Sequence, residues 1–235
     1  MSETPDIAGR IAAQLDRASG FRDAAKADPK AATARQRIRA WQSQRLARTH
    51  ASLLANPQFA EAAAFFLTDI YGANDPARLY DDVRRVLPTV VKILPAAGLE
   101  TVSDAIELDA LSEDLDAAMV KTLGKRVNRL TAAAYGEAYR KVDRRKDREH
   151  QIDLIQHLGQ SLDRLAKRPF ISTALRMMRK PAQVAGFGEL QSFLERGYTA
   201  FRKMGSADEF IDRVITHERK LLEALFAGDD SLLAA

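Results

Sequence analysis

Hydrophobic residues recur along most of the chain at the spacing of one face of an α-helix. No stretch alternates between polar and apolar positions for long enough to predict a strand. We therefore expect an all-α protein. Its helices should cover the segments 5–18, 31–55, 57–71, 76–94, 99–123, 127–143, 145–167, 170–179, 187–204 and 207–227.

The spacing of these segments predicts a single domain. Apolar stripes on consecutive helices with short connections favour a mostly antiparallel bundle of about eight to ten helices. Residues 1–30 should form an N-terminal helix followed by a linker at 20–30, and 31–227 should form the bundle. Residues 228–235 should form a flexible tail, and we also expect a helix break at Ser112.

Composition narrows the class of protein. The 235 residues include no Cys, which excludes disulfides, thiolate metal sites and a Cys nucleophile. The first ten residues carry acids and no apolar stretch, so they predict no secretory signal. The longest strictly apolar run, Ala62–Leu67, is far shorter than a membrane span of about 20 residues. A soluble, cytoplasmic protein without membrane contact is expected.

A few charged residues interrupt the apolar stripes. Asp69 lies on the apolar side of the segment 57–71, and Glu218 lies between Val214 and Leu221. An ionised carboxylate among apolar neighbours needs a cationic partner, because burying it alone is very costly. We therefore expect a buried polar network that holds the bundle in register. Its candidate members are Arg45, Asp69, Glu137, His217 and Glu218.

The same carboxylates allow a metal-dependent alternative. Asp69, Glu137, His217 and Glu218 could converge on iron or manganese, as in heme-oxygenase-like or ferritin-like di-iron oxidases. Ferritin-like sites use two Glu-x-x-His motifs, however, and the chain contains none. The triad His150, Asp153 and His157 shares a helix face opposite the apolar stripe and is expected to face solvent.

Two basic segments allow a third interpretation, nucleic-acid binding. The chain has 36 basic and 32 acidic residues, a net charge of only +4, so the charge balance gives this interpretation little support. Aspartates interrupt the second segment, and solvated, salt-bridged helix faces are the simpler explanation. The candidate residues are Arg35, Arg37, Arg39 and Arg48 near Trp41, and Arg144, Arg145, Lys146 and Arg148.

The segment FFLTDIY, Phe65–Tyr71, resembles the FFLEELY-type motif of an uncharacterised bacterial all-helical family. The segments Arg179–Ala182 and Phe193–Met204 are also similar to such proteins. The chain departs from the motif at Thr68, Asp69 and Ile70, where the pattern has Glu, Glu and Leu. The resemblance implies a helical fold and no particular activity.

The sequence carries no decisive catalytic motif, so our leading interpretation is a non-catalytic binding or assembly module. Its partner could be another protein, a second copy of the chain, or a small apolar ligand held between helices. No cofactor is expected on this interpretation. The metal-dependent oxidase and the nucleic-acid-binding protein remain the alternatives.

Overall fold

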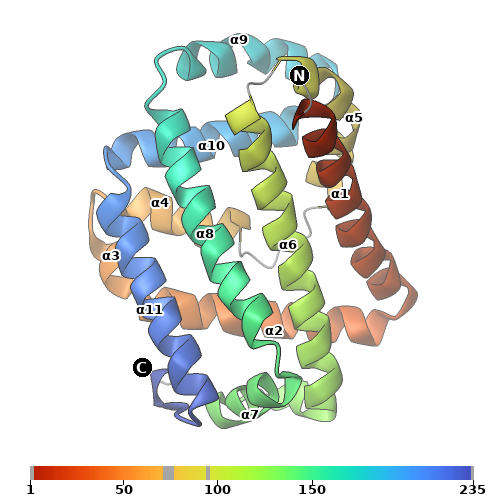
Figure 1. The fold of residues 1–235 in the computed structure, drawn as a ribbon, viewed down its shortest axis with the longest axis vertical. Helices are drawn as coiled ribbons and strands as arrows, with labels where there is room; N and C mark the ends of the chain where they lie inside the picture. The colour runs from red at the N-terminus through yellow and green to blue at the C-terminus, as the bar shows by residue number, and fades with distance from the viewer. Residues whose placement is uncertain (1–2, 71–76, 94–95, 234–235) are drawn as a thin grey trace.

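The computed structural model describes residues 3–70, 77–93 and 96–233 (Figure 1). Within these ranges every regular element is helical, which confirms the predicted all-α class. Eleven α-helices are present there, against the eight to ten that were expected. No helix among the described residues is long and apolar enough to cross a membrane.

The elements follow the predicted segments with shifted ends. The α-helices are α1 (Glu3–Ala27), α2 (Pro29–Thr49), α3 (Ala51–Ala55), α4 (Ala60–Phe65), α5 (Ala77–Ile93), α6 (Ala96–Leu123), α7 (Ala132–Val142), α8 (Arg145–Ala166), α9 (Ile171–Val184), α10 (Gly188–Met204) and α11 (Asp208–Phe226). A π-helix, η1, spans Phe66–Ile70, and two 3-10 helices, η2 and η3, span Gly124–Arg129 and Ser231–Leu233.

Helix α6 is the centre of the arrangement. It packs between α1 and α8, and α11 packs on the other side of α8. Figure 1 shows α1, α6, α8 and α11 running side by side along the long axis of the molecule, while α2 and α10 cross them. Because α6 contacts neighbours on several sides, it buries polar as well as apolar residues, including Glu113 and Asp116.

One interruption predicted from the sequence is much shorter than expected, and another is absent. Helix α1 continues through most of the expected linker to Ala27, and Asp28 then caps α2 by accepting hydrogen bonds from the backbone of Lys30 and Ala31. Helix α6 does not break at Ser112, because that hydroxyl donates to the carbonyl of Leu108 within the helix.

The expected flexible tail packs onto the bundle as far as the structure describes it. Leu233 is only 1% exposed, and Asp230 accepts hydrogen bonds from Arg140 on α7. Asp230 also lies directly over Gly136, where a Cβ atom would meet its carboxylate. The tail is therefore part of the fold between residues 228 and 233.

The segment 57–71, predicted as one helix, lies in the core but is not one α-helix. Phe59, Ala62 and Phe65 are buried, and the π-helix η1 follows α4 directly; Tyr71 lies outside the described residues. Gly197 on α10 packs against the ring of Phe65, so the absence of a side chain there allows α4 and α10 to approach closely.

We predict that Gly197→Ala destabilises the protein by about 1–3 kcal/mol, because an added Cβ would lie 2.9 Å from the Phe65 ring. Chemical denaturation would measure the effect. Gly20→Ala is the matched control, since nothing lies within 4 Å of that position and alanine favours the helix. Equal stability of both variants would contradict the packing role.

Candidate functional site

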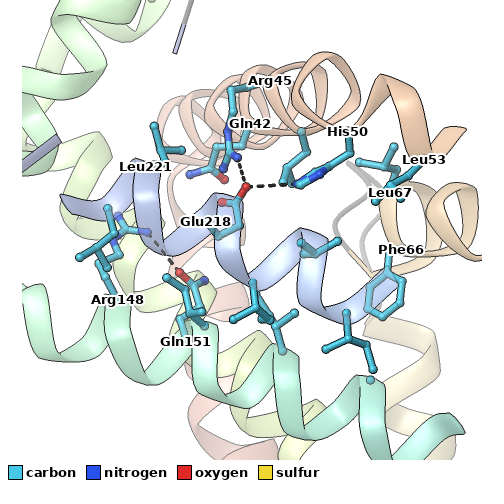
Figure 2. Close-up of a pocket in the computed structure, with 18 of the residues that line it drawn as sticks. Gln42, Arg45, His50, Leu53, Phe66, Leu67, Arg148, Gln151, Glu218 and Leu221 are labelled. Carbon is cyan, nitrogen blue, oxygen red and sulfur yellow. Dashed lines mark hydrogen bonds and ion pairs between the residues drawn. The ribbon is translucent and has the colours of Figure 1, made fainter. Parts of the chain in front are cut away.

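A partly enclosed cavity of about 120 Å³ lies between α2, α3, α4, η1, α7, α8 and α11 (Figure 2). Most of its wall is apolar. The wall includes Leu53, Phe66, Leu67, Ile152, Ile155, Phe210, Ile211, Val214 and Ile215. Ligand sites commonly combine such an apolar wall with a few fixed polar groups.

Glu218 of α11 provides the central polar group of the wall. Its carboxylate accepts a hydrogen bond from Arg45 of α2 at 2.5 Å and lies 3.3 Å from Nε2 of His50, at the junction of α2 and α3. Glu218 interrupts the apolar stripe of α11, so the packing of that stripe carries the carboxylate inward. The ion pair thus joins α11 to the end of α2.

The environment of Glu218 keeps it ionised. Burial raises the pKa of its carboxyl, but the charge of Arg45 and the hydrogen bonds from His50 and Arg45 outweigh burial. Together they lower the pKa from 4.5 to about 2. The ring of His217 lies near His50, with the ring centroids 5.6 Å apart, and burial lowers the pKa of His217 below 6.5.

Arg148 of α8 lies at one end of the cavity with Gln151 (Figure 2). Its guanidinium carbon lies 4.6 Å from the centre of the Tyr139 ring. The Nη1 atom is 3.5 Å from Oε1 of Gln151, at the limit of a hydrogen bond. Among the described residues, Nη2 has no hydrogen-bond partner although Arg148 is only 7% exposed.

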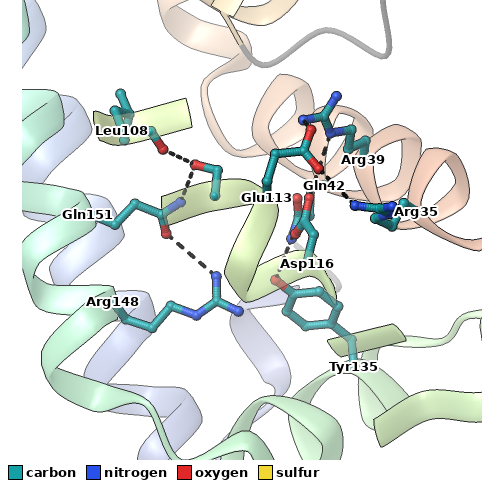
Figure 3. Close-up of polar contacts among 10 residues, drawn as sticks. Arg35, Arg39, Gln42, Leu108, Glu113, Asp116, Tyr135, Arg148 and Gln151 are labelled. Carbon is teal, nitrogen blue, oxygen red and sulfur yellow. Dashed lines mark hydrogen bonds and ion pairs between the residues drawn. The ribbon is translucent and has the colours of Figure 1, made fainter. Parts of the chain in front are cut away.

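A second polar cluster joins α2 to α6 beside the cavity (Figure 3). Arg35 and Arg39 both pair with Glu113, and Arg39 also lies 3.8 Å from Asp116. The amide of Gln42, which lines the cavity, lies 3.1 Å from Asp116. Burial raises the pKa of Asp116 from 3.8 to about 6, despite the opposing charges of Arg39 and Arg148.

The structure brings together three of the five residues expected in one network, namely Arg45, His217 and Glu218. Asp69 pairs instead with Arg196 of α10, beside Thr68 in a separate surface hollow. Glu137 is largely exposed and pairs with Arg126.

These placements also separate the residues of the metal alternative. Asp69 and Glu137 each have their own arginine, away from the pair His217 and Glu218. Among the described residues, no group of three or more His, Asp and Glu side chains could hold a metal ion. His150, Asp153 and His157 are exposed on α8, as expected.

Most of the basic residues considered for nucleic-acid binding contact the protein itself. Arg35, Arg39 and Arg148 belong to the interior clusters described above. Arg144 pairs with Asp114 and Asp147, and Arg145 with Glu149 and Glu223. Arg37 donates to Asn128, Arg48 donates to the carbonyl of Leu233, and Lys146 is exposed.

Sequence reasoning missed the polar residues that α6 and the α2–α3 junction contribute. Glu113, Asp116, Gln42 and His50 were not among the candidates, and Arg148 was considered only for nucleic acid. A usable signal existed in α6, where apolar residues occur around most of the helix. Such a helix is buried on several sides, so its charged residues need internal partners.

Comparison with family models places residues 21–232 in the family described as Domain of unknown function (DUF8198). The chain therefore belongs to that family, which agrees with the expected uncharacterised family. No curated protein and no solved structure matches the chain.

We predict that Glu218→Gln lowers the free energy of unfolding by about 3–5 kcal/mol at neutral pH, because it leaves the buried charge of Arg45 without its carboxylate. Denaturant unfolding measures this loss. Glu137→Gln removes an exposed ion pair of the same kind and should change stability little. Equal losses of unfolding free energy in the two variants would contradict a larger contribution of the buried Glu218 pair.

The pKa of Asp116 predicts a pH dependence of stability. Between pH 3.8 and about 6 the folded protein holds a proton that the unfolded chain has released. The stability of the wild type relative to Asp116→Asn should therefore fall as the pH rises through this window. Denaturation at a series of pH values measures this difference in stability, and a difference that does not change with pH would contradict the prediction.

The lowered pKa of Glu218 predicts the opposite pH dependence. The stability of the wild type relative to Glu218→Gln should rise as the pH rises from about 2 to 4.5, and the same denaturation series measures it.

Proposed function

We propose that this protein is a non-catalytic binding protein and that a small, mainly apolar molecule occupies the cavity. The observation that carries the proposal is the cavity itself, whose apolar wall meets a few polar groups fixed by other residues. The space of about 120 Å³ is much larger than one water molecule, and apolar cavities of similar size can hold small apolar molecules.

The chemistry of the wall favours binding over catalysis. A general base works best when its pKa lies near the working pH. The pKa of Glu218 is lowered to about 2 by Arg45 and His50, so the carboxylate is a poor proton acceptor. Its contacts hold α11 against α2, which is the role of a structural ion pair.

The resemblance to the FFLEELY-type motif has a place in this proposal. Phe65 packs in the core between α4 and α10. Phe66 and Leu67 are the first residues of the π-helix η1 and line the cavity. Such π-helical turns occur frequently at functional sites. We propose that this segment shapes the cavity, and that the aromatic and apolar residues of the motif form part of the cavity wall.

Assembly with a second copy or with another protein is a second candidate, supported by the surface of α9. Met177 and Met178 are 71% and 52% exposed, and Val184 at the end of the helix is 91% exposed. Exposed apolar side chains gathered on one helix are typical of contact surfaces.

The binding proposal predicts that the wild-type protein binds octan-1-ol saturably and that Leu67→Trp weakens this binding at least about tenfold, because the indole fills the cavity. Chemical-shift titration measures the affinity. Leu194→Trp, at a 44%-exposed position of α10 outside the cavity, should bind as the wild type does. The proposal fails if the wild type shows no saturable binding, or if both variants bind equally well while circular dichroism shows both to be folded.

A further inference from the structure

We propose that the ligand of this cavity is a monoanionic carboxylate with an apolar chain, and that Arg148 binds its carboxylate group. This inference rests on the proposed function, because it names the chemistry of a molecule held in the same cavity. It starts from Arg148, which lines the cavity and is 7% exposed.

The hydrogen-bonding of Arg148 is incomplete. A guanidinium carries five N–H donors, and leaving a buried donor without an acceptor costs free energy. Nη2 has no acceptor among the described residues, and the contact of Nη1 with Gln151 is long. The Gln151 amide is itself held by a 2.7 Å hydrogen bond to Ser112, so it is fixed rather than free to turn toward the arginine. The Tyr139 ring lies against the guanidinium and stabilises its positive charge in part. It does not accept a hydrogen bond from the N–H groups in the plane of the guanidinium.

The carboxylates nearest to this end of the cavity are engaged by other cations. Glu113 is shared by two arginines, and Glu218 is engaged by Arg45 and His50. Arg148 interacts with Asp116 only at longer range, through charge. An anionic group bound in the cavity would therefore give Arg148 an acceptor without breaking these pairs.

The arrangement of the cavity selects the kind of anion. In Figure 2, Arg148 and Gln151 lie at one end of the cavity, whereas Phe66 and Leu67 lie at the other, with Glu218 between them. A molecule with an anionic head and an apolar body matches both ends. A carboxylate matches the planar guanidinium, because its two oxygens can accept two N–H groups side by side. A phosphate dianion would bring more charge and more acceptors than this end provides for, next to the carboxylate of Glu218.

The test compares octanoate with octan-1-ol, which share a chain length and differ in the charged head. We expect the wild type to bind octanoate about ten- to hundredfold more tightly than the alcohol, the range for a hydrogen-bonded charge. Arg148→Met should abolish this preference and retain binding of the alcohol. Arg145→Met is the matched control, because Arg145 lies on the same helix but pairs with Glu149 and Glu223 outside the cavity.

A second measurement does not depend on a variant. The Nε–Hε resonance of Arg148 should shift on addition of octanoate to the wild type and remain in place on addition of octan-1-ol. Equal affinity for acid and alcohol, an unchanged preference in Arg148→Met, or inorganic phosphate binding as tightly as octanoate would each overturn the carboxylate assignment and leave the proposed cavity binding intact. Absence of binding by both the acid and the alcohol would overturn both proposals.

Discussion

Glu218 carries a negative charge within the apolar stripe of α11, and the arrangement of the neighbouring helices depends on compensating it. Burying a carboxylate without a partner costs too much free energy. Helix α11 can therefore bury Glu218 only where Arg45 and His50 lie close enough to pair with it. That requirement fixes α11 against the end of α2. The break between α2 and α3 at His50 serves the same purpose, since it places the imidazole beside the carboxylate.

The buried ion pairs fix the positions of the helices that surround the cavity. Arg35, Arg39, Glu113 and Asp116 join α2 to α6, while Arg45 and Glu218 join α2 to α11. Such polar contacts are directional and hold the helices at set positions, in contrast to apolar packing alone. Between helices fixed in this way, the apolar side chains of α8, α11 and η1 do not close completely. Arg148 lines the space that is left.

The sequence predicts which side of a helix is buried where a single regular helix carries one apolar stripe. The inward position of Glu218 and its pairing with an arginine of the segment 31–55 followed from such faces. Asp69 was placed with them by the same reasoning and lies elsewhere, because η1 is π-helical and its wider turn changes the direction of the side chains that follow Phe66. Glu137 lies at the edge of its stripe, where a small rotation decides between burial and solvent.

The sequence by itself determined that the protein is all-α, where most helices lie, and that the carboxylate of Glu218 needs a cation. Only the tertiary structure decided which cations pair with which carboxylates, that residues 228–233 pack onto α7, and that an unfilled space lies beside Arg148. The reason is physical. Helical periodicity is a local property of the chain, whereas pairing and cavities arise from side chains far apart in sequence, brought together by helix packing.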